Sequence, residues 1–328
     1  STIDAATDIY VINTYYQSKE LYGQANAMLA MLLANMFGQL VSVLGQYRKK
    51  GWLTFLRETF ITMLFLRPAV DAYRISTNHE DDEVTVDQLS EMLITKGLEL
   101  SFESIPGCVL QLYVWLSAPK EAGTYALVSI GISCLTTGFV SAMMAFDMDV
   151  DAPHRKAQPN FYGYIPNDNS LRGRCFILMT LMSSLHNLSR TLGCVLFALS
   201  DTEHLLFIFL GGEIGSYIVA KILRRDFYYW IPRLSGPLKI LISILCRICV
   251  KVIVDFTGCL HYRHPYELGG LGFIISMIWA QVFPFVALQY FDGDTKGSIA
   301  VFLAVSFMLW LVLNIIFFCT IDLSYLNT

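Results

Sequence analysis

Long apolar stretches, each roughly 20 residues long and interrupted by few charges, follow one another along the chain. Ala27 to Leu44, Tyr125 to Ala145 and Ile299 to Thr320 are typical examples. Their unbroken apolar character predicts helices, because membrane strands would alternate apolar and polar residues over about ten positions. About 20 apolar residues are also what an α-helix needs to cross a hydrocarbon core of about 30 Å. The pattern therefore predicts an all-α polytopic membrane protein.

The pattern predicts eight transmembrane helices and two re-entrant half-membrane segments in a single integral membrane domain, residues 1–328. Two apolar segments, 52–75 and 236–262, are interrupted by charges such as Arg67 and Lys251, so we expect them to enter the membrane and return on the same side. The full crossings are expected at about 4–17, 21–47, 91–117, 124–147, 173–200, 205–223, 268–291 and 298–321.

The distribution of basic residues sets this topology, because short loops rich in Lys and Arg stay in the cytoplasm. Basic clusters fall at 48–50, between Arg155 and Arg174, and at 224–225. If 52–75 crossed completely, the cluster between Arg155 and Arg174 would become external. The re-entrant arrangement keeps all these clusters on one side, and it predicts that both termini are cytoplasmic. As a separate expectation, the membrane is the plasma membrane.

Composition excludes an ordinary set of soluble domains, which carry roughly 25% charged residues. Here 55% of the residues are hydrophobic and 15% are charged, and the mean hydropathy is +0.51. The net charge of −4 provides no basic field for nucleic acid. We therefore expect membrane phospholipids, and possibly a membrane-protein subunit, as partners. Because the chain starts at Ser1 without a methionine and stops just past an apolar stretch, we expect it to belong to a longer chain.

Charged residues inside the predicted helices are the main candidates for function, because insertion of each costs about 2.5–3.5 kcal/mol. The candidates are Asp4, Asp8, Glu99, Glu103, Arg190 and Glu213. Asp4 and Asp8 lie four residues apart, as do Glu99 and Glu103, so each of these two pairs shares a helix face. Arg190 is expected to pair with at least one acid, since its guanidinium can serve two carboxylates at once. A buried ion pair that only fixes helix register is the structural alternative. The surplus of acids favours nearby water or a charged headgroup.

A helix kink is predicted at Pro106 and Gly107 in the third crossing, because proline removes a backbone donor. Gln111 follows one turn later. Freed carbonyls at such a kink can bind a polar solute, although a kink that serves packing alone is the more common case.

The motifs of enzymes and metal proteins are poorly matched. A group of cysteines and histidines imitates zinc-ligand spacing, but the spacing is irregular, so we expect no metal and no other cofactor. His186 and Ser189 lie three apart on a helix without a candidate oxyanion hole, so we expect no enzyme. The imitating group is Cys246, Cys249, Cys259, His261 and His264.

Several short motifs, in order along most of the chain, resemble those of the XK-related family of membrane proteins, which includes phospholipid scramblases. The matching pieces are Asp4 to Tyr16, Leu21-Tyr22-Gly23, Leu98 to Tyr113, Ser189 to Leu192, and Leu196-Phe197-Ala198. The resemblance implies eight crossings with two half-membrane helices, and it implies lipid scrambling. Two features depart from the family: Gly107 follows Pro106 where the family usually has Gln, and residues 224–268 show little similarity.

Three functions remain open at this point. In the first, the protein is a phospholipid scramblase in which the intramembrane charges form a polar track for lipid headgroups. In the second, it is a solute or ion transporter with a closed site at the Pro106 kink. In the third, it is a non-transporting structural subunit of a membrane complex. An open furrow of carboxylates would favour the first, and an enclosed site the second.

Overall fold

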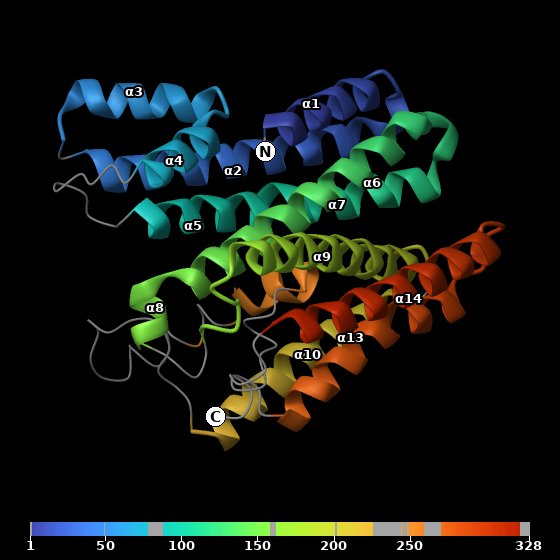
Figure 1. Cartoon of the computed structure of the whole chain (residues 1–328). Helices are drawn as coiled ribbons and strands as arrows, with labels where there is room; N and C mark the ends of the chain where they lie inside the picture. Colours follow the sequence, from blue (N-terminus) through green and yellow to red (C-terminus); the bar gives the residue numbers. More distant parts are fainter. Residues whose placement is uncertain are drawn as a thin grey trace. The chain divides into compact units, whose positions relative to one another are not determined.

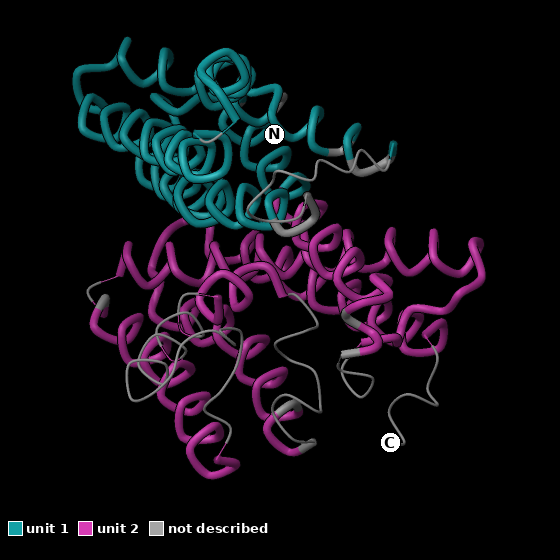
Figure 2. The backbone as a smooth tube through the Cα atoms, turned by 90° about the vertical axis from the view of Figure 1, so that its left-hand side faces the viewer, with its two compact units in different colours: residues 1–136 teal, residues 137–328 magenta. Residues whose placement is uncertain are grey.

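A computed structural model describes residues 2–48, 50–77, 88–157, 162–200, 202–225, 244, 248, 250–258 and 270–321. The regular structure of these residues is helical and includes no strand, which confirms the all-α prediction. The chain forms two compact units, unit 1 over residues 1–136 and unit 2 over residues 137–328 (Figure 2). Helix α7 (Pro119–Val150) contributes residues to both units.

Unit 1 is a bundle built around α2 (Figure 1). Helix α2 packs against α1, α3, α5, α6 and the π-helical turn. An apolar cluster that includes Tyr15, Ala25 and Val114 forms part of its core. The elements are α1 (Thr2–Tyr16), a 3-10 turn (Lys19–Leu21), α2 (Tyr22–Tyr47), α3 (Trp52–Met63), α4 (Arg67–Ser76), α5 (Gln88–Glu99), the π-helical turn (Leu100–Ser104) and α6 (Ile105–Ser117).

Unit 2 is organised around α9, which packs against α10, α13 and α14 (Figure 1). Asp168 caps the start of α9 by accepting hydrogen bonds from the backbone N–H groups of Ser170 and Leu171. Residues 250–257 are also helical. The remaining elements of this unit are α8 (Ala152–Ala157), α9 (Asn169–Ala198), α10 (Glu203–Leu223), α13 (Gly270–Tyr290) and α14 (Lys296–Thr320).

Each of the eight segments predicted as crossings corresponds to helical structure. The third, 91–117, consists of α5, the π-helical turn and α6 in succession. Segment 52–75 is divided into two short helices, α3 and α4, joined at residues 64–66. Most of segment 236–262 and the cysteines and histidines with zinc-like spacing lie outside the described residues.

Four of the described helical segments are long and apolar enough to cross a membrane. They are Lys19–Tyr47, Tyr125–Val150, His204–Leu223 and Lys296–Thr320. The distribution of side chains agrees with this, because large apolar residues such as Phe37 and Leu53 are 69% and 83% exposed. Among the residues whose burial the structure describes, the two largest fully buried side chains are instead Arg67 and Arg190. A surface this apolar around a polar interior identifies a membrane-embedded protein.

Within unit 2, Gly138 allows α7 and α9 to approach closely. A Cβ atom at this position would lie 2.6 Å from the backbone nitrogen of Ser184 and 2.8 Å from the carbonyl oxygen of Thr180. Small residues at helix crossings permit this kind of backbone contact in membrane proteins. The sequence therefore needs glycine here for packing.

Candidate functional site

Four carboxylates predicted as candidates, Asp4, Asp8, Glu99 and Glu103, form a buried acid cluster in unit 1. Each side chain is 5% exposed or less. Asp8 interacts electrostatically with Asp4 and Glu103, and Glu103 also interacts with Glu99. The cluster therefore concentrates like charges from α1, α5 and the π-helical turn.

Neutral side chains from three other helices bind most of this acid cluster. Ser133 Oγ donates to Asp4 Oδ1 over 2.8 Å, and Gln111 Nε2 donates to Asp8 Oδ1 over 2.8 Å. Asn35 Nδ2 donates to Glu103. These amides and hydroxyls satisfy acceptor oxygens but supply no positive charge.

Lys96 is the cation that contacts the acid cluster, through a salt bridge of 2.7 Å from Nζ to Glu99 Oε2. Among the described residues, Glu99 thus pairs with a lysine, whereas Asp4, Asp8 and Glu103 accept hydrogen bonds from neutral side chains. The cluster is acidic, and its charge is suited to a cation or to the ammonium group of a lipid.

Three fully buried polar atoms of unit 1 accept or donate no hydrogen bond within the described part of the chain: Tyr15 Oη, Gln111 Oε1 and Ser129 Oγ. Gln111 already binds Asp8 through its other amide atom. Tyr15 interacts electrostatically with Asp8. Buried polar groups normally have a hydrogen-bond partner. The interior beside Asp8 therefore carries more polar atoms than the contacts between the described helices satisfy.

The backbone departs from α-helical geometry just before Pro106, where a kink was predicted. Residues Leu100–Ser104 form one π-helical turn, and Ile105 N–H donates to the carbonyl oxygen of Leu100. Pro106 then stands in the first turn of α6, where its missing N–H costs least. The π-helical turn carries Glu103, and α6 carries Gln111 one turn beyond Gly107. Single π turns inside helices are frequent at functional sites.

Arg190 and Glu213 form a second buried group, in unit 2. Arg190 Nη1 donates to Glu213 Oε1 over 3.1 Å, and Nη2 donates to Oε2. The guanidinium also lies over the ring of Phe283, 4.4 Å from its centroid. Both terminal nitrogens therefore bind one carboxylate, which confirms the expectation that Arg190 pairs with at least one of the candidate acids. The six predicted charges are divided between two groups, each within its own unit.

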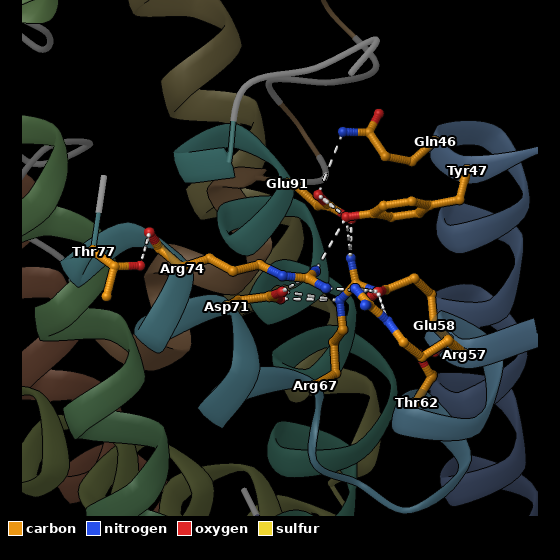
Figure 3. A network of polar contacts seen from close by, with 10 residues as sticks. All are labelled: Gln46, Tyr47, Arg57, Glu58, Thr62, Arg67, Asp71, Arg74, Thr77 and Glu91. Carbon is orange, nitrogen blue, oxygen red and sulfur yellow. Dashed lines mark hydrogen bonds and ion pairs between the residues drawn. The ribbon is translucent and has the colours of Figure 1, made fainter. Parts of the chain in front are cut away.

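A third group, centred on Arg67, was missed as a site by sequence reasoning (Figure 3). The Arg67 guanidinium binds Glu58 and Asp71 over 2.9 and 3.1 Å and also binds Glu91. Arg74 binds Glu58 over 2.6 Å. In the sequence Glu58, Arg67 and Asp71 appeared as interruptions of segment 52–75, whereas Glu91 begins the next predicted crossing. The available signal was their spacing, because Arg67 and Asp71 lie four apart on one face of a short helix.

The Arg67 network connects four helices of unit 1. Tyr47 Oη of α2 donates to Glu91 of α5 over 3.0 Å and accepts from Arg67 and Arg74 of α4. Glu58 belongs to α3. Because each carboxylate here meets at least one arginine, this group is balanced internally. Its arrangement explains how the α3 and α4 hairpin is held to α2 and α5.

Together these groups define the class of protein: an all-α membrane protein with ionic groups buried between its helices. Comparison with known proteins found no matching family model, no matching curated protein and no matching solved structure. Among residues that the structure describes, no three His, Cys, Asp or Glu side chains are grouped to hold a metal ion.

Proposed function

We propose that the protein moves phospholipids between the two leaflets of its membrane, with the acid cluster of unit 1 as part of a polar track for headgroups. The observation that carries this proposal is the charge of the cluster. Four carboxylates are buried in an apolar environment at considerable cost, yet their partners are mainly neutral. An ammonium group of a passing headgroup would supply the missing positive charge.

The exterior of unit 1 suits the other half of a phospholipid. Leu33, Phe37 and Val41 on α2 are large, apolar and exposed, so they present a hydrocarbon-like surface. On the opposite side of α2, Asn35 and Gln39 are buried and hydrogen-bonded to each other. A lipid could thus keep its acyl chains in the bilayer while its headgroup passes between helices, which reduces the cost of transferring the charged group through hydrocarbon.

The proposed path is closed in this conformation, because all four carboxylates are buried. Lipid movement then requires α1 and α6 to separate at Asp8 and Gln111, whose hydrogen bond links the two helices. We therefore propose that scrambling follows an activating event. The π-helical turn beside Pro106 provides a local irregularity at which such a rearrangement can start.

We also propose the full topology of eight crossings and two half-membrane segments, with both termini on the cytoplasmic side of the plasma membrane. Helices α3 and α4 contain 12 and 10 residues, or about 18 and 15 Å at 1.5 Å per residue. Each is shorter than a hydrocarbon core of about 30 Å. Trp52, Leu53 and Phe60 project outward from α3, so this helix suits insertion into one leaflet.

The motif resemblance supports a relationship to the XK-related family. Asp4 and Asp8 belong to the first matching motif, Glu99 and Glu103 to the third, and Arg190 to the fourth. In the structure these charged motif residues are buried. The proposal assigns the family's lipid scrambling to this chain on that basis, together with the acid cluster.

Ion or solute transport is the second candidate function. The observation that favours it is the enclosure of the acid cluster, together with Gln111 Oε1, which accepts no hydrogen bond from a described residue. The enclosed negative charge of these acids suits a passing cation as well as a headgroup, even though no three of the described acids are grouped to hold a metal ion. The two functions differ in what crosses the membrane.

A liposome experiment separates them. The chain is reconstituted with fluorescent phosphatidylcholine in both leaflets, and dithionite added outside reports lipid that reaches the outer leaflet. We expect wild type to scramble after activation, and we expect Glu99→Gln with Glu103→Gln to slow it, because the substitutions keep size and remove charge. Asp292→Asn, at a side chain that is 96% exposed, is the matched control and should behave as wild type.

Ion flux measured in the same liposomes completes the test. Cation flux, reported by a cation-sensitive dye inside the liposomes, would favour the transporter and contradict the scramblase if it occurred without lipid movement. Scrambling that is unchanged in the Glu99→Gln, Glu103→Gln protein would contradict the role of the acid cluster.

A further inference from the structure

Unit 2 carries a groove that takes no part in the proposed track. Its volume is about 490 Å³, and it is lined by α10, α13 and Lys251 of the helical residues 250–257. The walls include Leu223, Leu271 and Ile275, which are exposed apolar side chains. A volume of this size is typical of ligand sites, and the lining is suited to a hydrocarbon chain.

The groove is long along α10. Its lining on this helix runs from Gly212 to Arg224, about 18 Å at 1.5 Å per residue. At one end the two helices lie close together, because a Cβ atom added at Gly212 of α10 would make van der Waals contact, at 3.5 Å, with the Trp279 ring on α13. The shape is therefore that of a channel along two helices, which matches an extended acyl chain better than a compact solute.

Charged residues lie at defined places in this groove. Glu213 is buried and binds Arg190, and Lys251 is buried and binds Asp255. Of the charged lining residues, Arg224 is the exposed one, at the C-terminal end of α10. An exposed guanidinium at the end of an apolar groove is suited to attract a phosphate by its charge.

The surroundings of the groove favour a lipid over other occupants. Phe207, Ile208 and Ile222 of α10 are also exposed and apolar, so the groove is continuous with a surface that faces hydrocarbon in a membrane-embedded protein. Acyl chains are the most abundant apolar molecules beside such a surface. Arg224 also belongs to a basic cluster on the side proposed to be cytoplasmic, and the cytoplasmic leaflet carries the anionic lipids.

We propose that the groove between α10 and α13 binds an anionic phospholipid, with one acyl chain along Val219, Leu223 and Ile275 and the phosphate at Arg224. This site requires a membrane-embedded protein but does not require scrambling. A bound lipid here would hold α10 and α13 together on the outside of the Arg190 and Glu213 ion pair, which joins α9 to α10.

Photolabelling of the full chain in phosphatidylcholine vesicles tests the site. The probes are phosphatidylglycerol and phosphatidylcholine that carry the same diazirine-bearing acyl chain, and labelled peptides are identified by mass spectrometry. We expect phosphatidylglycerol to label the α10 and α13 residues of the groove preferentially. Labelling spread evenly over the exposed apolar helices would overturn the proposal.

Two pairs of matched variants sharpen this test. Ala220→Phe fills the groove and should lower its labelling by roughly tenfold, or about 1.4 kcal/mol, whereas Ile222→Phe changes an exposed residue of α10 outside the groove and should leave labelling unchanged. Arg224→Gln should reduce the preference for phosphatidylglycerol about fivefold, given about 1 kcal/mol per arginine near an anionic surface. Arg225→Gln is its control.

The variants also identify other occupants. A photoreactive amino acid at Val219 should cross-link to lipid, and cross-linking to another segment of this chain or to a second protein would overturn the proposal. Equal labelling by the two wild-type probes would remove the assignment of the phosphate to Arg224. Because scrambling is measured separately, loss of the labelled site with unchanged lipid movement would distinguish this site from the track in unit 1.

Discussion

Arg190 on α9 and Glu213 on α10 bind each other through both terminal nitrogens of the guanidinium and both oxygens of the carboxylate. The residues are 23 positions apart in the chain. Phe283 of α13 lies against the guanidinium, 4.4 Å from ring centroid to Cζ. This group therefore connects three helices of unit 2 in its interior, and it is the first place to test what the buried charges contribute.

Removal of Arg190 alone should destabilise the protein strongly. Arg190→Ala leaves Glu213 buried without its cation, which costs about 3–5 kcal/mol for a buried pair. Replacement of both residues, by Arg190→Met with Glu213→Met, should recover most of that loss, because no charge is then left unpaired. Thermal unfolding in detergent measures both proteins. Equal losses in the single and double variants would contradict the pairing.

Arg67 should be essential for the attachment of α3 and α4. Arg67→Met leaves Glu58, Asp71 and Glu91 with fewer cationic partners, so the hairpin should open more often. Hydrogen exchange measured by mass spectrometry should increase in α3 and α4 and change little in α14. Arg57→Met is the control, because the Arg57 side chain is 67% exposed and its salt bridge to Glu58 is worth little. Equal hydrogen exchange in the two variants would show that Arg67 does not hold α3 and α4 to the rest of unit 1.

Glu103→Gln should raise the thermal stability of the protein while it slows the proposed movement of lipid. The substitution removes one of four neighbouring negative charges, and Gln keeps an oxygen that can accept from Asn35. Acids retained at a cost in stability are typical of functional sites. The melting temperature, compared with that of Asp292→Asn, measures the effect. A lower melting temperature for Glu103→Gln would indicate that this carboxylate serves the structure instead.

Gly138→Ala should destabilise unit 2, because the added Cβ would meet the backbone of α9 at Thr180 and Ser184. Overpacking of this kind costs about 1–3 kcal/mol. Gly131→Ala lies on the same helix, and its Cβ would have no neighbour within 4 Å. The control should therefore be neutral or more stable, by up to about 1 kcal/mol from helix propensity. Thermal unfolding of the two variants decides the comparison.

The proposed topology predicts which side of the membrane each loop occupies. In a cysteine-free background, Thr77→Cys and Lys156→Cys should react with an impermeant maleimide from the cytoplasmic side, and Asp292→Cys should react from outside. The reason is that α3 and α4 return to the side they left. External labelling at Thr77 with cytoplasmic labelling at Asp292 would show that segment 52–75 crosses fully.

The positions of the helices and the burial of particular charges could be predicted from the sequence. Long apolar runs predict helices directly, because each turn of a helix satisfies its own backbone groups in a membrane. Spacing of four residues placed Asp4 with Asp8 on one face, and both are buried. The cost of a charge in hydrocarbon also indicated that Arg190 needs an acid, and Glu213 was among the acids considered.

Only the tertiary structure decided which groups meet. The partners of Asp4, Asp8 and Glu103 lie 129, 103 and 68 positions away in the chain. Nor did the sequence separate the acid cluster of unit 1 from the ion pair of unit 2, or connect Tyr47 and Glu91 with Arg67. The physical reason is that both surfaces of a membrane helix are largely apolar, so hydrophobic periodicity sets the rotation of each helix only weakly. Contacts between specific side chains determine that rotation, and with it the grouping of the charges.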